Sequence, residues 1–297
     1  MICKIGKRIR VIRSECLKNN RCFEFSRFGF SSAVVYRPLD SQAVRECLIN
    51  PEKFFRNGKI VKDSRTTKAA LTELSDGKKV FLKKYNNKGF VYSLKYLLRK
   101  ARAYRAWSNG WTLEACHIPT PRNIGASSHR KWGILKSAYL ITEVVENCVE
   151  VIDFYKIIQK NEYLRAEYID RIVYLICRLH DNQIIHGDLK LSNFYIKKCS
   201  EGKYDFGFWD LDGTKFYSSP LTVQQRRNEL ARAVASYIEL GLRIDLKVDE
   251  NAVTKLFLNK YSEYTNVDLS GSEIEEIIST YVEKSHRRIK KYGKKQN

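Results

Sequence analysis

The sequence lacks the hydrophobic segments that carry a chain into or across a membrane. No run approaches the ~18 consecutive apolar residues typical of a transmembrane helix. The basic start, Met1 to Arg10, is not followed by the apolar segment of a secretory signal. We therefore expect neither a membrane-spanning helix nor a secretory leader.

Cysteine is present but lacks the spacing of a metal or disulfide framework. None of the eight cysteines forms a C-x-x-C pair, and only five histidines are available as additional ligands. We therefore expect reduced thiols in a cytosolic protein.

Acidic residues are scarce: 33 Asp and Glu stand against 54 Lys and Arg, a net charge of +21. Because 43% of the residues are hydrophobic and 12% aromatic, the chain is not a disordered polycation. The charge predicts an anionic partner, which could be nucleic acid, an acidic membrane surface or a phosphorylated substrate. No nucleic-acid recognition motif is present, which disfavours the first.

The order of predicted elements divides the chain into a β-rich part and a helical part. Alternating and β-branched segments predict strands at 22–25, 33–36, 69–74, 79–85 and 138–145, and a helix over about 91–116. After a connector near Glu146, helices are expected from 153, at 168–180, 224–240 and 273–282, with short strands at 193–196 and 204–209. The expected parts are an extension with strands partly packed on the next part (1–60), a β-rich lobe (61–146), a helical lobe (147–283) and a solvated basic tail (284–297).

The strongest chemical signal is the segment His186-Gly-Asp-Leu-Lys-Leu-Ser-Asn193. Its spacing matches the kinase catalytic loop H-R-D-L-x-x-x-N. Phosphoryl transfer to a hydroxyl needs a carboxylate at the nucleophile, an oxygen ligand for metal and a cation near the phosphate. Asp188, Asn193 and Lys190 supply these three groups. Gly187 in place of arginine favours a small-molecule kinase over one switched by loop phosphorylation, and a degenerate loop without catalysis is the alternative.

A second metal carboxylate is expected after the loop, at the end of a strand, and two aspartates compete for it. Asp205 begins a literal D-F-G, whereas Asp210 begins Asp-Leu-Asp-Gly. Strand alternation places Asp210 on the face shared by Phe206 and Phe208, at the strand end. We therefore predict Asp210 as the ligand, with Asp212 as a possible helper.

Nucleotide contacts are expected from the β-rich part. Val80-Phe-Leu-Lys83 matches the V-A-I-K pattern, so Lys83 is predicted to bind ATP phosphates. The strand around Thr142, Glu143 and Val145 fits an adenine-binding hinge that lends backbone groups.

Two customary parts of a kinase are not evident. There is no G-x-G-x-x-G, and the segment 63–68 is either a phosphate-binding loop or an ordinary polar turn. A glutamate that would pair with Lys83 is also lacking: Ala106 stands at the expected position, and Glu114 is a fallback better interpreted as a surface residue.

These motifs together resemble a known family. The catalytic loop, Lys83-Lys-Tyr, Lys100–Trp107, Ile118-Pro-Thr-Pro121 and Trp209-Asp-Leu-Asp212 are similar to the bacterial lipopolysaccharide core kinases, which act on 3-deoxy-D-manno-octulosonic acid (Kdo) or heptose. The resemblance covers about residues 60–235. It implies an α+β, two-lobed protein-kinase-like fold, with ATP and Mg²⁺ as cofactors and an inner-core sugar hydroxyl as acceptor.

The same resemblance implies which anionic partners the positive charge would bind. It implies a lipopolysaccharide or lipid A–core precursor as partner, and a cytoplasmic protein held peripherally on the anionic inner face of the inner membrane. The acid-free basic cluster at 78–105 and the two basic ends would make that contact. Two other functions stay open: an aminoglycoside- or choline-type kinase, and a weakly catalytic kinase-like module that binds anionic glycolipid.

Overall fold

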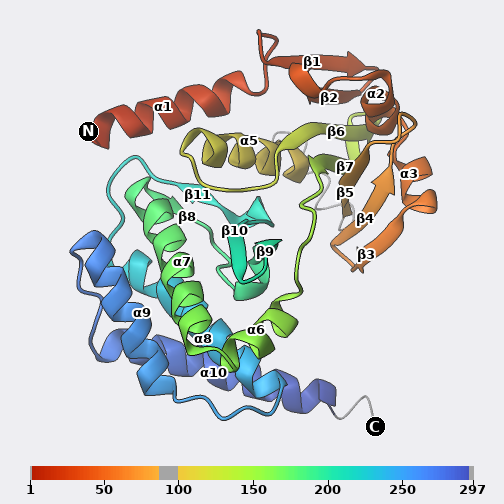
Figure 1. Ribbon diagram of the computed structural model, residues 1–297. Helices are drawn as coiled ribbons and strands as arrows, with labels where there is room; N and C mark the ends of the chain where they lie inside the picture. Colours follow the sequence, from red (N-terminus) through yellow and green to blue (C-terminus); the bar gives the residue numbers. More distant parts are fainter. Residues whose placement is uncertain (1, 87–99, 294–297) are drawn as a thin grey trace. The chain divides into compact units, whose positions relative to one another are not determined.

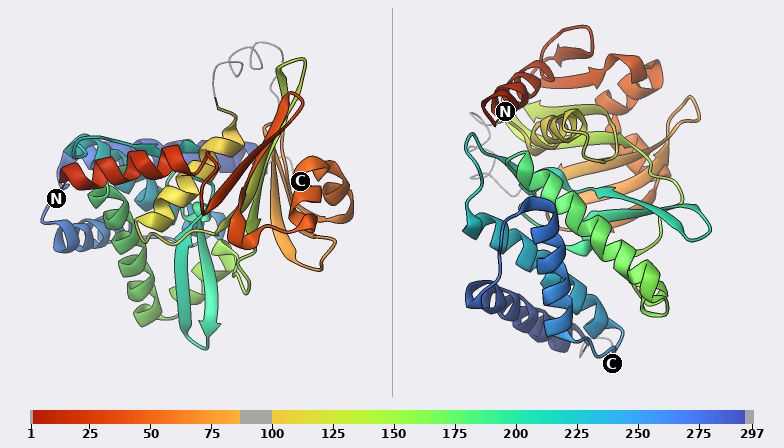
Figure 2. Two further views of the ribbon diagram at one scale, coloured as in Figure 1. Left: turned by 90° about the horizontal axis from the view of Figure 1, so that it is seen from above. Right: turned by 60° about the vertical axis from the view of Figure 1, so that its left-hand side comes forward.

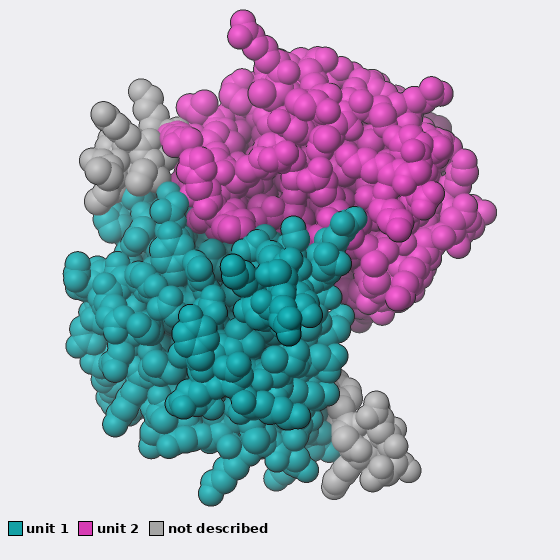
Figure 3. Space-filling model, viewed as in Figure 1, with its two compact units in different colours: residues 1–6, 146–209, 213–297 teal, residues 7–145, 210–212 magenta. Residues whose placement is uncertain are grey.

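The computed structural model describes residues 2–86 and 100–293, and the chain divides into two compact units. Unit 1 contains residues 1–6, 146–209 and 213–297, and unit 2 contains residues 7–145 and 210–212 (Figure 3). The segment Asp210–Asp212 is therefore built into the β-rich unit, although it follows the helical unit's strands in sequence. No helix among the described residues is both long and apolar enough to cross a membrane.

Unit 2 is organised around one antiparallel sheet. Its order is β1-β2-β6-β7-β5-β4-β3 (Figure 1). The strands are β1 (Phe23–Phe28), β2 (Ser31–Tyr36), β3 (Lys59–Asp63), β4 (Thr67–Glu73), β5 (Lys79–Asn86), β6 (Asn123–Lys131) and β7 (Ile134–Glu143).

Helices cover both faces of this sheet because successive strand residues point to opposite sides. On one face, Val34, Tyr85 and Leu140 pack with α5 (Arg102–Ala115) and with Cys16, just after α1 (Ile2–Glu15). On the other face, Val35, Leu82 and Ile141 pack with α2 (Gln42–Ile49) and α3 (Pro51–Asn57). Figure 2 (left) shows the sheet nearly edge-on, between α5 in yellow and the α2–α3 pair in orange.

All five strands predicted for the β-rich part lie in this sheet, but the strands β3 and β6 and the helices α1, α2 and α3 were not predicted. The strand β6 was missed because its Ser127, Ser128 and His129 interrupt the apolar pattern, although Ser127 and Ser128 are buried and hydrogen-bonded. The helices α1, α2 and α3 were missed in the charge-rich first 60 residues. Of the helix predicted over 91–116, α5 begins only at Arg102, and residues 87–99 lie outside the described residues.

Unit 1 is mainly helical with short hairpins. The helix α7 (Glu162–Asp181) leads into β8 (Ile184–Ile185), the catalytic-loop segment, and the turn η2 (Leu191–Asn193). The antiparallel hairpin β9–β10 follows, and β11 pairs with β8. The remaining elements are α6 (Val151–Gln159), β9 (Phe194–Ser200), β10 (Lys203–Phe208), η3 (Leu211–Gly213), β11 (Lys215–Phe216), α8 (Val223–Arg243), α9 (Glu250–Thr265) and α10 (Ser272–Gly293), with η3 reaching across the unit boundary.

The last helix is longer than the sequence indicated. The expected helix at 273–282 continues to Gly293, so the residues expected in a solvated tail from 284 begin inside α10. The reason is packing against α8: Ser285 is buried and donates a hydrogen bond to Glu239 at 2.9 Å, and Arg288 lies 3.7 Å from the same carboxylate. Side-chain contacts thus stabilise a stretch whose charge alone suggested a solvated tail.

Candidate active site

In unit 1, the loop after β8 places three polar side chains together. The carboxylate of Asp188 is half exposed, and both of its oxygens lie 3.1 Å from Nζ of Lys190. Asn193 donates from Nδ2 to the main-chain oxygen of Asp188 at 2.7 Å, which leaves its Oδ1 as an acceptor. The predicted catalytic residues of the loop are therefore neighbours in space as well as in sequence.

A buried carboxylate on α8 holds the backbone of this loop. Glu229, only 5% exposed, accepts hydrogen bonds from the amide groups of His186 (2.7 Å) and Gly187 (2.8 Å). About two turns later on the same helix, Ser236 accepts from the amide of Leu191 at 3.0 Å. The long helix α8 thus fixes the chain on both sides of Asp188.

A buried histidine lies next to the carboxylate of Glu229. The side chain of His180 is fully buried, with Nε2 3.6 Å from Glu229 and Nδ1 2.8 Å from the hydroxyl of Tyr261. Burial lowers the pKa of His180, although the neighbouring carboxylate opposes this effect. The imidazole is therefore held neutral in the interior.

A steric constraint explains why the H-G-D motif has a glycine at position 187. Gly187 has a φ of 84°, a conformation that side chains disfavour. A Cβ at this position would also lie 2.5 Å from the carbonyl oxygen of Gly213. The loop backbone therefore has no room for the arginine of the usual motif.

Beside Asp188, unit 1 has a pocket of about 710 Å³ with a strongly basic wall. Arg232, one turn after Glu229 on α8, places Nη2 4.0 Å from Oδ1 of Asp188. Further cations come from Lys215 and from the described part of α10. The pocket joins the candidate base to a surface suited to anions.

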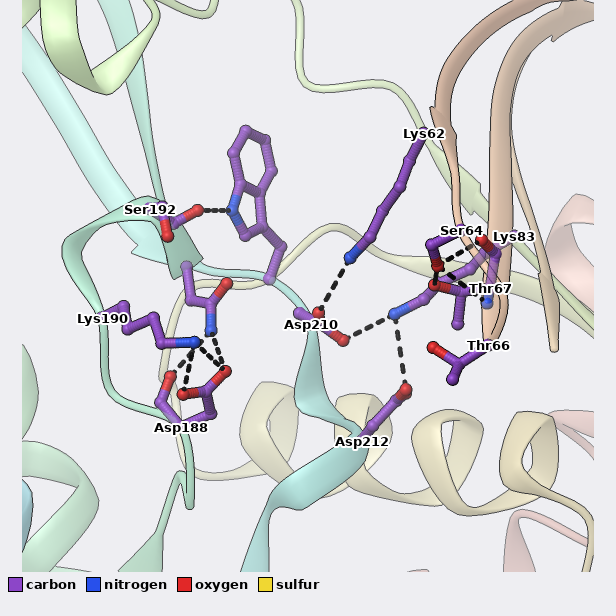
Figure 4. A network of polar contacts seen from close by, with 12 residues as sticks. Lys62, Ser64, Thr66, Thr67, Lys83, Asp188, Lys190, Ser192, Asp210 and Asp212 are labelled. Carbon is purple, nitrogen blue, oxygen red and sulfur yellow. Dashed lines mark hydrogen bonds and ion pairs between the residues drawn. The ribbon is translucent and has the colours of Figure 1, made fainter. Parts of the chain in front are cut away.

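In unit 2, the predicted nucleotide lysine forms an ion network. Lys83 on β5 is 8% exposed, and its Nζ lies 2.6 Å from Oδ1 of Asp210 and 3.6 Å from Oδ2 of Asp212 (Figure 4). Lys62 on β3 lies 3.9 Å from the other oxygen of Asp210. The neighbouring Lys84 points to the opposite face and pairs with Glu52 at 2.6 Å.

Asp212 is held from two further directions. Its Oδ1 accepts from the hydroxyl of Tyr85 at 2.8 Å, and its Oδ2 accepts from Arg102 at 2.7 Å. Burial raises the pKa of Tyr85 well above its usual value, and the charge of Asp212 adds to this effect, so the phenol stays a donor. Both Lys83 and Arg102 also lie over the Tyr85 ring.

The two aspartates that compete for the metal role have different surroundings. Asp205 lies within β10 opposite Lys197, and it accepts a hydrogen bond from Sγ of Cys199 at 3.1 Å. Asp210 comes after the end of β10 with a φ of 59°, a conformation that is uncommon outside glycine. Of the two, Asp210 is the one with a recorded ion pair to Lys83.

The segment 63–68 forms the hairpin turn between β3 and β4. Its hydroxyls are used within the turn: Ser64 Oγ donates to the carbonyl of Thr67 at 2.9 Å and accepts from the Thr67 amide at 3.2 Å. The carbonyl of Thr66 accepts from the amide of Asn86 at 3.1 Å. The turn is thus shaped by side-chain hydrogen bonds where kinases commonly use glycines.

The predicted hinge residues lie at the end of β7. Thr142 and Glu143 are the last residues of this strand, beside Phe81 and Val80 of β5, and Val145 is the last residue of unit 2 before the chain enters unit 1. The amide of Glu143 already donates to the carbonyl of Arg122 at 2.9 Å.

The expected glutamate partner of Lys83 does not come from α5. The helix has a single acid, Glu114, which pairs with Arg122 at 3.0 Å, and Ala106 is buried against the sheet. Within residues 2–86 and 100–293, the carboxylates recorded beside Lys83 are Asp210 and Asp212.

Several residues of the site were not singled out from the sequence. Glu229 has a possible signal, since an acid stands among the apolar positions of a predicted helix. Tyr85 and Arg102 act through long-range contacts with Asp212, and Arg232 through proximity to Asp188. Nothing in local spacing indicates these partners.

The comparisons with known proteins identify the family. The model of the lipopolysaccharide kinase (Kdo/WaaP) family matches residues 54–254, about two thirds of the chain. The chain belongs to this family. The predicted resemblance is thereby confirmed, and the matched segment of this Kdo/WaaP family member includes Lys83, Asp188 and Asp210.

A curated relative and a solved structure agree with this assignment. The chain is 29% identical over 164 residues to a 3-deoxy-D-manno-octulosonic acid kinase from Mannheimia succiniciproducens, covering 55% of the chain and 65% of that relative. The structure of WaaP in complex with acyl carrier protein matches with a TM-score of 0.53 at 16% identity, covering 83% of this chain and 95% of that one. The predicted α+β, protein-kinase-like fold is thereby confirmed.

Proposed function

We propose that the chain is an ATP-dependent kinase that phosphorylates a sugar hydroxyl of the lipopolysaccharide inner core. The observation that carries this proposal is the Asp188 carboxylate, half exposed beside Lys190 and bordering a basic pocket, on a loop held by Glu229. Family membership supports phosphoryl transfer as the chemistry, and the Kdo kinase relative supports a sugar acceptor.

Each loop residue has a role in this reaction. Asp188 orients the acceptor hydroxyl and accepts its proton as the bond to the γ-phosphorus of ATP forms and the bond from that phosphorus to the leaving ADP breaks. Lys190 offsets the negative charge on the transferred group. Glu229 keeps the loop in one conformation, so the carboxylate is placed before the substrates bind.

The residues present suit Mg²⁺. The Asn193 amide keeps Oδ1 available while its Nδ2 is used, and Asp210 offers a partly exposed carboxylate. Amide and carboxylate oxygens are the donors that this ion prefers in proteins. When bound, the ion would neutralise charge on the ATP phosphates.

Lys83 is proposed to contact the ATP phosphates, with Thr142, Glu143 and Val145 beside the adenine. In protein kinases a helix glutamate holds this lysine. Here Asp212 is placed to do so, since its two oxygens are engaged by Tyr85 and Arg102 and Lys83 lies 3.6 Å away. We therefore favour a positioning role for Asp212 over that of a helper metal ligand.

The competing functions make different demands on the pocket. Aminoglycoside- and choline-type acceptors are cationic and need acidic walls, whereas the wall beside Asp188 carries five Lys and Arg residues. A module that only binds glycolipid would show no ATP turnover. Turnover with purified core oligosaccharide therefore separates the first proposal from both alternatives.

Attachment to the anionic inner face of the membrane belongs to this proposal, with the cytoplasm as the compartment. The 78–105 cluster is a weaker candidate than its charge implied, because Lys83, Lys84 and Arg102 are engaged within unit 2. The described basic residues of α10 and α1 are the better candidates for attraction to acidic lipids. Sedimentation with anionic vesicles tests this step, and unchanged binding after neutralising these helices would contradict it.

The acceptor is tested in cells. Mass spectrometry of the lipopolysaccharide core should show one phosphate fewer when the protein is removed, and restoration when it is supplied again. Fragmentation would assign that phosphate to Kdo or to heptose. If the core has the same phosphate content in cells with and without the protein, the proposed function is contradicted.

A further inference from the structure

The pocket beside Asp188 contains an arginine with an ion pair to Asp188 but, among the described residues, no hydrogen-bonded acceptor. The side chain of Arg232 is 13% exposed, and among the described residues its guanidinium donates no hydrogen bond. The one carboxylate recorded near it is Asp188, at 4.0 Å, which is too long for a hydrogen bond. A guanidinium has five donors, so this side chain keeps hydrogen-bonding capacity for a bound oxyanion.

The orientation of Arg232 is set by its surroundings. Its guanidinium carbon lies 4.8 Å from the centre of the Tyr281 ring on α10, a cation–π contact. Arg232 stands one turn after Glu229, the residue that holds the loop. The same helix therefore fixes the position of Asp188 and of the cation beside it.

Other cations extend this surface around the pocket. Lys215 lies on β11 beside the loop, and Lys284 on α10 lies 5.8 Å from the Tyr281 ring centre. In the part of the chain that the structure describes, neither has a recorded carboxylate partner. Arg287 and Arg288 also line the pocket, with Glu283 at 3.2 Å and Glu239 at 3.7 Å as their partners.

We propose that this pocket binds the acceptor through an oxyanion, a carboxylate or phosphate of the sugar, with Arg232 as the main contact. The inference rests on the proposed function and adds to it the class of acceptor. Because Arg232 and Asp188 are 4.0 Å apart, the anionic group and the reacting hydroxyl belong to one sugar residue or to directly linked residues. A neutral sugar without such a group leaves the guanidinium unpaired and is a poor acceptor.

The packing of α10 on α8 builds one side of the pocket. Packing of Ser285 and Arg288 against Glu239 places Lys284 and Tyr281 at the rim. These residues of α10 thus act as specificity residues for the acceptor.

The first test measures binding without turnover. The probes are free Kdo, its methyl ester and inorganic phosphate, titrated by calorimetry into the wild-type protein. We expect Kdo to bind and the ester to bind about 10- to 100-fold more weakly, the scale of one or two hydrogen bonds to a charged group. Equal binding of acid and ester overturns a carboxylate as the recognised group, and failure of phosphate to compete with Kdo would contradict a shared oxyanion site.

The second test measures turnover with Arg232→Gln, Arg232→Lys and Lys284→Gln, with Arg171→Gln on the outer face of α7 as the matched control. We expect Arg232→Gln to raise the acceptor KM by about 10- to 100-fold with the ATP KM unchanged, and Arg232→Lys to recover part of the loss. A raised ATP KM with an unchanged acceptor KM would assign the cation to nucleotide instead. Lys284→Gln, at an exposed site, keeps the test valid if Arg232→Gln fails to fold.

The outcomes separate this inference from the proposed function. If the wild-type protein binds MgATP but phosphorylates no core acceptor, the proposed function fails. If it phosphorylates the acceptor and neither Arg232→Gln nor Lys284→Gln changes the acceptor KM, the pocket assignment alone fails.

Discussion

Arg102 donates to Asp212 at 2.7 Å, and this bond holds a carboxylate beside Lys83 where kinases commonly use a helix glutamate. Both residues of the pair are mostly buried. The acid beside Lys83 thus comes from the Asp-Leu-Asp segment, and α5 contributes a cation where a glutamate is expected. The family member keeps an ion pair for its lysine without a glutamate on the helix.

Arg102→Gln should lower MgATP affinity by about tenfold. Without the guanidinium, Tyr85 and Lys83 are the recorded partners that remain for Asp212. We expect Lys83 to turn toward Asp212 and away from the nucleotide. A tenfold loss of affinity is about the effect of losing one hydrogen bond to a charged group. Calorimetric titration with MgATP measures the effect. Arg122→Gln, which breaks the exposed pair with Glu114, is the control and should bind MgATP as the wild-type protein does. Equal affinities of the two variants for MgATP would show that Arg102 does not contribute to nucleotide binding.

Asp210→Asn and Asp205→Asn separate the two candidates for the metal ligand. The first change should lower kcat by at least about 100-fold, the scale of losing one electrostatic contact to the reacting group. The second should leave kcat near the wild-type value, because Asp205 contacts Cys199 on the β9–β10 hairpin. Rates at saturating ATP and acceptor are the measurement. A loss of activity confined to Asp205→Asn would reverse the assignment.

Gly187→Ala should destabilise the protein more than Gly202→Ala. Both glycines have a positive φ, 84° and 67°, so both changes carry a backbone cost of order 1–3 kcal/mol. Only the Cβ at 187 meets a neighbour, the carbonyl of Gly213, whereas nothing lies within 4 Å at 202. Urea unfolding of the two variants gives the difference directly. Equal free energies of unfolding would show that the loop can accommodate the methyl group.

The free energy of unfolding should decrease as the pH is lowered from 7.5 to 5.5. Burial lowers the pKa of His180 and of His129 below the ordinary 6.5. Below about pH 6.5 the unfolded chain therefore binds protons that the folded chain does not, and each histidine contributes a loss of up to ~1.4 kcal/mol per pH unit. The loss ends when the pH falls through the folded pKa.

The variants His129→Gln and His286→Gln test this origin by urea unfolding across the same pH range. The first removes one buried histidine and should reduce the pH dependence, and the second replaces an exposed residue of α10 as the control. A pH dependence that is unchanged in His129→Gln would contradict the contribution of that residue.

The sequence predicted what is local. Asp188, Lys190 and Asn193 fall within six residues, and their spacing alone indicated the loop. Lys83 was predicted from the short, regular strand pattern around it, and strand alternation favoured Asp210 over Asp205; both roles stay predictions. The family resemblance rested on the same short segments.

What could not be predicted depends on contacts between distant segments. Arg232 approaches Asp188 from α8, and Arg102 approaches Asp212 across 110 positions. The strand β6 carries buried serines whose hydroxyls hydrogen-bond to Ser32 and His129. Its sequence pattern is therefore polar, although the strand lies inside the sheet. The helical extension of α10 depends on Glu239 of α8, which no local pattern reveals.

The central claim, that Asp188 accepts the proton of a sugar hydroxyl during transfer from ATP, has one direct measurement. It is the single-turnover rate of phosphate transfer from MgATP to a Kdo-containing inner-core oligosaccharide, compared between the wild-type protein and Asp188→Asn. We predict one phosphate added by the wild-type protein and a rate about 10²- to 10⁴-fold lower for the variant, with MgATP binding and unfolding midpoint retained. Transfer by Asp188→Asn at the wild-type rate would contradict the account.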